Sequence, residues 1–77
     1  MRPVRAVWGQ RIRLARTERG ITQVRLAAAM GVTQQVVSKW EAGVSSPADE
    51  RRPELARILG VDVAELFGYP TGKEVAA

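Results

Sequence analysis

Apolar residues recur three or four positions apart in short segments that glycine or proline separates, a spacing typical of amphipathic helices. In residues 6–19, Trp8, Ile12 and Ala15 follow this spacing and predict a first helix, which Gly20 ends. Three arginines of this helix are expected to be mostly solvated: Arg11, Arg13 and Arg19.

The five residues before this helix are expected to form an extended arm. Pro3 removes a backbone hydrogen-bond donor, and Arg2 and Arg5 would repel each other in a compact turn. The arm either contacts a phosphate or stays loose, and the sequence leaves both alternatives open.

Two short helices joined by a tight turn are predicted next, between Ile21 and Gly43. Thr22 is a suitable N-cap for the first of them. Gly31 ends it, because glycine adopts the left-handed conformation at little steric cost, and Val32 then points back into the core. The apolar stripe expected on this helix consists of Val24, Ala27, Ala28 and Met30.

The second helix of the pair follows Thr33, a suitable N-cap, and is expected to bury Val37 and Trp40. Such a pair is a helix-turn-helix, whose second helix fits the major groove of DNA. Glutamine amides match the N6 and N7 edge of adenine, and lysine donates to guanine. Polar residues on a helix face often do no more than interact with solvent, which is the alternative here. The polar face consists of Gln34, Gln35, Ser38 and Lys39.

Residues 44–49 have the composition of a loop. Its two serines, Ser45 and Ser46, either donate to phosphate or only solvate the loop. Pro53 suits the first turn of a fourth helix, which would then begin near residue 51 or 52 and end at Gly60. The apolar stripe of this helix consists of Leu55, Ile58 and Leu59.

A short fifth helix is predicted at residues 63–67. Asp62 is a natural N-cap, and Glu65, three positions later, would complete a capping box. Leu66 and Phe67 are expected to face the core.

These elements predict one all-α, five-helix domain at residues 6–68, between the arm at residues 1–5 and a flexible C-terminal tail at residues 69–77. The chain of 77 residues contains neither Cys nor His, which excludes zinc fingers, thiol catalysis, serine–histidine chemistry and disulfides. No apolar run is long enough to cross a bilayer and no signal peptide is evident, so we expect a cytoplasmic protein. Nothing indicates an enzyme, a cofactor, a metal or a small-molecule ligand.

Charge is distributed unevenly along the chain. Residues 1–40 hold eight Arg or Lys against one acid, whereas residues 41–77 hold four against seven. The first half is therefore the part that faces a polyanion.

The run ITQVRLAAAMGVTQQVVSKWEAG at residues 21–43 follows Ile12, Ala15 and Arg16, and the run LARILGVDVAELF follows it at residues 55–67. With this spacing, the chain resembles the Cro/C1-type (XRE) helix-turn-helix family of phage repressors and bacterial regulators. The resemblance implies a lambda-repressor-like fold and a repressor that binds double-stranded DNA.

The resemblance also implies roles for the third helix. Gln34, Gln35 and Lys39 would contact base edges, together with Ser38 on the same face. Thr33 or Val36 would contact a thymine methyl group. Lys39 stands where the most similar short lambdoid repressors have a third glutamine, which implies a different base pair at that position of the operator.

A second implied set contacts the phosphate backbone. Gln23, at the start of the second helix, would donate to a phosphate with help from the helix dipole. Arg16 and Glu41 would form a partly buried ion pair, although Arg16 also has the reach to contact a phosphate. The complete phosphate set is Gln23, Arg16, Arg25, Ser45 and Ser46. Ala42 departs from the family, since relatives often carry a polar or basic residue there.

A single recognition helix contacts only a few base pairs, so selectivity implies a homodimer on a palindromic operator. The fifth helix and residues 67–69 are the expected dimer contact, unless they only complete the core. The alternative function is a protein-interaction module, such as an antitoxin, that holds a protein partner through its acidic half.

Overall fold

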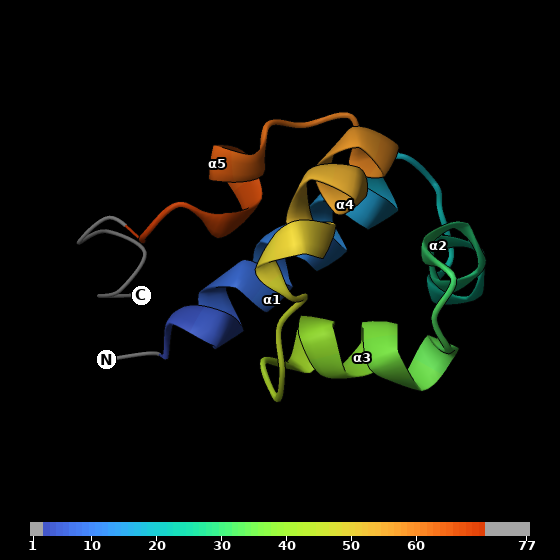
Figure 1. The fold of residues 1–77 in the computed structure, drawn as a ribbon, viewed down its shortest axis with the longest axis horizontal. Coiled ribbons are helices and arrows are strands. Elements are labelled where there is room, and N and C mark those ends of the chain that lie inside the picture. The colour runs from blue at the N-terminus through green and yellow to red at the C-terminus, as the bar shows by residue number, and fades with distance from the viewer. Residues whose placement is uncertain (1–2, 71–77) are drawn as a thin grey trace.

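The computed structural model describes residues 3–70, which form five α-helices and one short 3-10 helix and no strand. In Figure 1, α1 lies between α3 on one side and α4 and α5 on the other, and α2 lies at one end. The predicted all-α, five-helix architecture is therefore confirmed. The elements are α1 (Val4–Glu18), α2 (Gln23–Met30), α3 (Gln34–Ala42), the 3-10 helix η1 (Asp49–Arg51), α4 (Arg52–Leu59) and α5 (Val63–Phe67).

The ends of α2 and α3 follow local rules. The hydroxyl of Thr22 accepts from the backbone N–H of Arg25, and that of Thr33 accepts from the N–H of Val36. Gly31 takes the left-handed conformation, with φ 69°, between the two helices. These caps and this glycine bring α2 and α3 into the predicted helix-turn-helix.

The helix α1 begins at Val4, two residues earlier than the sequence predicts. Pro3 occupies the N-cap position, where its missing N–H costs nothing, and its carbonyl accepts from the N–H of Ala6. Val4 and Arg5 are thus helical rather than part of an arm, and residues 1 and 2 lie outside the described range. Arg5 donates to the carbonyl of Val44 and so connects α1 to the loop after α3.

The predicted apolar stripe of α2 includes two residues that the structure does not bury. Val24 is 57% exposed and Ala28 is also exposed, whereas Leu26, Ala27 and Met30 are buried. The periodicity admits either set, and packing of α2 against α3 and α4 selects the second.

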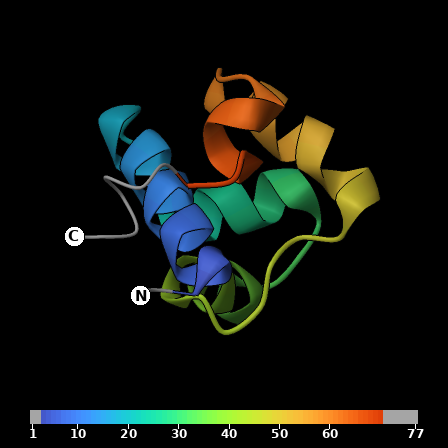
Figure 2. The same ribbon diagram turned by 90° about the vertical axis from the view of Figure 1, so that its left-hand side faces the viewer.

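The loop from α3 to α4 runs along the outside of the molecule (Figure 2).

The ends of α4 agree with the prediction, but the capping box predicted at the start of α5 does not form. Pro53 lies in the first turn of α4, which begins at Arg52 after the turn of η1. Asp62 occupies the N-cap position of α5, yet its side chain accepts no capping hydrogen bond. Its backbone carbonyl instead accepts from the N–H of Glu65.

Arg11 in α1 and Arg19 at its C-cap donate to backbone carbonyls rather than being only solvated. Arg11 donates to the carbonyl of Gly68 at 2.7 Å and to that of Leu66 at 3.3 Å. Arg19 donates to the carbonyl of Gly60 at 3.2 Å. Because carbonyls at helix ends lack helical partners, these arginines tie α1 to the ends of α4 and α5.

One hydrophobic core joins all five helices. Trp8 and Phe67 meet edge to face with ring centroids 5.6 Å apart, and the indole N–H of Trp8 donates to the carbonyl of Gly68. Leu66 and Phe67 therefore belong to the core rather than to the expected dimer contact. The core consists of Trp8, Ile12, Ala15, Leu26, Ala27, Met30, Val37, Trp40, Leu55, Ala56, Leu59, Leu66 and Phe67.

The helices α1 and α3 lie close together at Gly9. A Cβ built at Gly9 would lie 2.4 Å from the carbonyl oxygen of Trp40 and 2.6 Å from that of Glu41. The missing side chain therefore fixes the distance between the two helices.

We expect Gly9→Ala to lower the free energy of unfolding by about 1–3 kcal/mol, because the added methyl forces α1 away from α3. At an unconstrained helix position the same change would raise it by about 1 kcal/mol. Urea unfolding of both variants measures the sign, with Gln10→Ala at the next, exposed position as the control that changes stability little. Stabilisation by Gly9→Ala would contradict the close approach.

Candidate nucleic-acid interface

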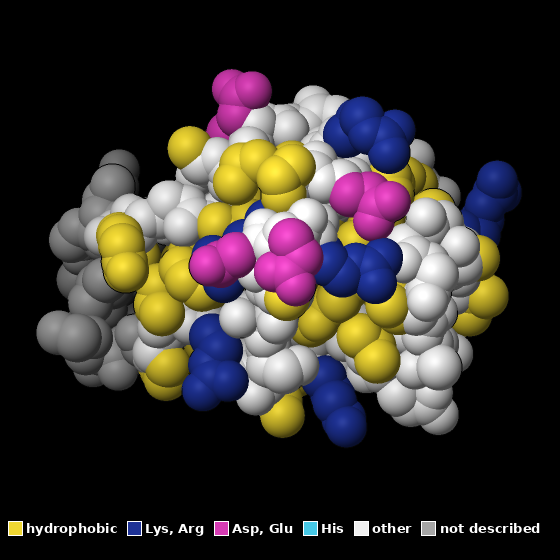
Figure 3. All heavy atoms as spheres, viewed as in Figure 1, with side chains coloured by type: hydrophobic (Ala, Val, Ile, Leu, Met, Phe, Trp, Pro, Cys, Tyr) yellow, Lys and Arg dark blue, Asp and Glu magenta, His cyan; other side chains and the backbone are white. Residues whose placement is uncertain are grey.

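The helix α3 presents one buried and one exposed face. Val37 and Trp40 are buried and fix the helix to the core, while Val36 is half-buried against it. On the face shown in Figure 3, basic but no acidic side chains are visible along the α3 edge. Five of the six residues predicted to contact bases are exposed, the exception being Val36: Thr33, Gln34, Gln35, Ser38 and Lys39.

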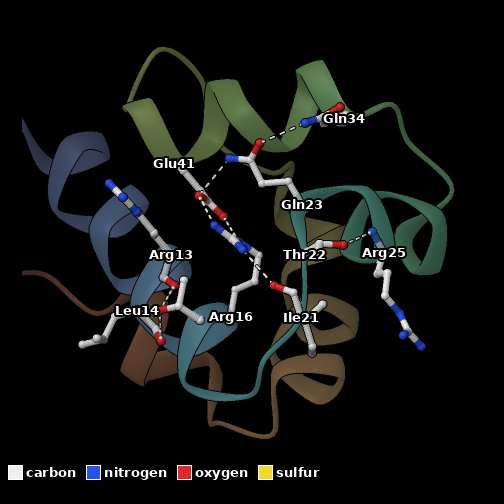
Figure 4. Close-up of polar contacts among 10 residues, drawn as sticks. Arg13, Leu14, Arg16, Ile21, Thr22, Gln23, Arg25, Gln34 and Glu41 are labelled. Atoms are coloured by element: carbon white, nitrogen blue, oxygen red, sulfur yellow. Dashed lines mark hydrogen bonds and ion pairs between the residues drawn. The ribbon is translucent and has the colours of Figure 1, made fainter.

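A buried ion pair ties α1 to the end of α3. The Arg16 Nε lies 2.5 Å from Glu41 Oε2, and Arg16 Nη2 donates to Glu41 Oε1 at 3.0 Å. Only 11% of the Arg16 side chain and 6% of the Glu41 side chain are exposed. The remaining terminal nitrogen of Arg16 donates to the carbonyl of Ile21 at 2.8 Å (Figure 4). One guanidinium thus joins α1, the segment before α2, and α3.

The hydrogen bonds that Arg16 donates to Glu41 raise the pKa of Arg16 above its ordinary value, and the Coulomb attraction of the carboxylate adds to this shift. Desolvation opposes this shift but is the smaller effect. A raised pKa means that the stabilisation is present at all pH values below the alkaline range in which arginine titrates.

The structure shows Arg16 in the predicted ion pair, and its predicted contact with a phosphate stays a prediction. The residue is buried, and its three guanidinium nitrogens all donate to acceptors inside the protein. Three of its five guanidinium N–H donors are thus used inside the protein.

A chain of side-chain contacts extends from this pair to the start of α3. Gln23 Nε2 donates to Glu41 Oε1 at 3.1 Å, and Gln34 Nε2 donates to Gln23 Oε1 at 3.4 Å. Figure 4 shows Gln23 between Glu41 and Gln34. The core of the domain thus orients one of the two glutamines at the start of α3.

The other predicted phosphate contacts lie around this chain. Arg25 is exposed on the first turn of α2, and in Figure 4 its side chain extends away from the ion pair. Ser45 and Ser46 are half-buried in the loop after α3.

A hollow of about 270 Å³ opens between α1 and α3 beside the ion pair. Arg13, three positions before Arg16 on the same helix face, lines it and was missed as a candidate. The i, i+3 spacing of the two arginines was the signal in the sequence. The other residues lining the hollow are Arg16, Gln23, Ser38, Glu41 and Ala42.

Within residues 3–70, no three Asp or Glu side chains lie close enough together to hold a metal ion. No helix in the same range has both the length and the apolarity that a bilayer requires.

Known proteins are similar to this chain in sequence and in fold. The family model described as Helix-turn-helix matches residues 12–66, which include α2, α3 and both residues of the ion pair. The chain belongs to the Cro/C1-type helix-turn-helix family.

Two relatives of this helix-turn-helix chain share its sequence over most of its length. An uncharacterized HTH-type transcriptional regulator of Sinorhizobium medicae is 37% identical over 59 residues, which are 77% of this chain and 42% of the relative. The 26 kDa repressor protein of Escherichia phage HK022 is 36% identical over 69 residues, which are 84% of this chain and 29% of the relative. This chain therefore spans less than half of either relative.

One similar solved structure is the restriction-modification controller protein C.AhdI from Aeromonas hydrophila. It is 32% identical, with a TM-score of 0.75, over 82% of this chain and 96% of that chain. The three relatives are named as a transcriptional regulator, a repressor and a controller protein, and none as an enzyme.

We expect Glu41→Ala to lower the free energy of unfolding by about 3–5 kcal/mol, because Arg16 would remain buried without its partner. Replacing both residues, Arg16→Met with Glu41→Leu, should cost less than the single change. Urea unfolding measures both variants.

The control for this prediction is Glu54→Ala. Glu54 pairs with Arg51 on the surface, where both side chains are more than a third exposed, and its loss should cost about 0–1 kcal/mol. If Glu41→Ala cost no more than Glu54→Ala, the buried pair would not hold α1 and α3 together.

Proposed function

We propose that the chain is a sequence-specific regulator of transcription that binds double-stranded DNA with α3 in the major groove. The observation that carries this proposal is the difference in burial between the two faces of α3. Its apolar face is fixed in the core while Gln34, Gln35 and Lys39 are exposed. An α-helix with its side chains is about 10–12 Å wide, which matches the roughly 12 Å width of the groove.

In this proposal, bases and backbone are contacted by different side chains. Gln34 and Gln35 each offer an acceptor and a donor, the pair that adenine requires, and Lys39 donates to guanine. The hydroxyl oxygen of Thr33 caps α3, and its methyl group would contact a thymine methyl group. Gln23 and Arg25, beside the first turn of α3, would donate to the backbone and set the register.

We further propose that the chain acts as a repressor and binds as a homodimer to two half-sites about one helical turn apart. The similarity to the phage HK022 repressor supports the first part. Two apolar side chains at the C-terminal side support the second, since Val63 is 38% exposed and Tyr69 is 85% exposed.

The same exposed side chains favour a second candidate function, a module that binds a protein partner. Exposed apolar groups next to acidic ones, here Asp62 and Glu65, suit a protein surface better than a polyanion. A band-shift titration over a range of salt concentrations separates the two functions, because a DNA-binding regulator prefers its own operator and loses affinity steeply as salt rises. Binding without any sequence preference, together with capture of a protein partner, would favour the module.

We expect Gln34→Ala and Gln35→Ala each to reduce discrimination between the selected operator and a shuffled duplex by about 1–3 kcal/mol. The affinity for shuffled DNA should hardly change, because the backbone contacts remain. Selection from a random pool supplies the operator, and band shifts measure both affinities.

The control is Gln10→Ala, which removes an exposed amide from α1. Both affinities of this variant should equal those of the unmodified chain. Full operator preference in the two α3 variants would show that other residues contact the bases.

A further inference from the structure

The hollow between α1 and α3 has no role in the function proposed so far. We propose that it binds one phosphodiester group of the DNA backbone and that Arg13 supplies the charge for this contact. The inference rests on the proposed function and adds a residue that the family resemblance does not assign. The volume of the hollow, about 270 Å³, leaves room for a phosphate group.

Arg13 differs from the other arginines of α1 and of its C-cap within the described part of the chain. Arg5, Arg11 and Arg19 donate to backbone carbonyls, and Arg16 is paired with Glu41. The guanidinium of Arg13 has no hydrogen-bond or ion-pair partner among residues 3–70, although it lines the hollow. Its five N–H donors thus remain available for the paired oxygens of a phosphate.

The charge balance inside the hollow favours an anion. Glu41 contributes a carboxylate, but Arg16 neutralises it at a distance of 2.5 Å. Arg13 remains as the uncompensated charge, so the six lining residues carry a net charge of +1.

Two neutral donors and one small residue complete the site. The Gln23 amide uses one N–H for Glu41 and keeps a second, and the hydroxyl of Ser38 is exposed. Ala42 ends at its Cβ and leaves the opening clear, where a longer side chain would extend into it. Ser38, predicted to contact a base, is here assigned to the phosphate.

The position of the hollow selects a backbone phosphate over a base. A helix of about 10–12 Å fills a groove roughly 12 Å wide, so the DNA strands pass along its two sides. Ser38 and Ala42 lie one turn apart on the side of α3 that faces α1. A strand on this side therefore passes between α3 and Arg13.

The test compares Arg13→Gln with Arg57→Gln, which removes the same charge from an exposed position of α4. Band shifts over a range of salt concentrations use the selected operator and a shuffled duplex. Arg13→Gln should weaken both complexes by the same factor, on the order of tenfold at low salt. The slope of log K against log salt should decrease in magnitude by about 0.9. Arg13→Lys should restore the slope, and Arg57→Gln should leave it unchanged.

A set of duplexes, each with one neutral methylphosphonate linkage, identifies the phosphate. One linkage per half-site should weaken binding of the unmodified chain and have no further effect on Arg13→Gln. Thermal unfolding checks that the variant is folded, which its exposed position leads us to expect.

The outcomes separate this inference from the proposed function. If Arg13→Gln kept the salt slope of Arg57→Gln, or weakened only the operator complex, the phosphate site would be overturned while sequence-specific binding survived. If the unmodified chain showed no sequence preference but Arg13→Gln still reduced the slope, the proposed function would fail and the site would stand. Absence of any DNA binding would overturn both.

Discussion

The structure depends on a single buried charge pair. Arg16 and Glu41 are almost fully removed from solvent, and each makes further hydrogen bonds, to the carbonyl of Ile21 and to the amide of Gln23. Charges in such a place are tolerated only when both are paired and their remaining donors and acceptors are used. The pair and its hydrogen bonds therefore connect α1, α2 and α3 at one point.

The fold was largely predictable because its signals are local. Thr22 and Thr33 cap helices through bonds that span three residues, and Gly31 needs only its own backbone. Signals that depend on neighbours in space failed. The apolar pattern could not exclude Val24 from the core of α2, since that choice belongs to the packing partners. Asp62 and Glu65 have the spacing of a capping box, but the Asp62 side chain caps nothing. The start of the five-residue α5 has only the backbone hydrogen bond from Glu65 to the carbonyl of Asp62.

The candidate site divides in the same way. The exposed polar face of α3 follows from helical periodicity, so Gln34, Gln35 and Lys39 were predictable as a group. The contacts that each arginine makes could not be predicted in this way. Arg11 and Arg13 are two positions apart in one helix, yet the first reaches a carbonyl near the C-terminal end and the second a hollow beside α3. Sequence gives their spacing, but only tertiary structure gives their partners.

The chain of contacts that ends at Gln34 makes two neighbouring, identical side chains unequal. Gln34 donates a hydrogen bond to the side-chain oxygen of Gln23, while Gln35 has no side-chain partner among residues 3–70. Immobilising a free side chain at an interface costs about 0.5–1.5 kcal/mol of rotamer entropy. For Gln34 part of this loss has already occurred when the domain folds, and for Gln35 all of it accompanies association. In the proposed complex with DNA, the first glutamine would therefore select one base rigidly, and the second would adapt to more than one.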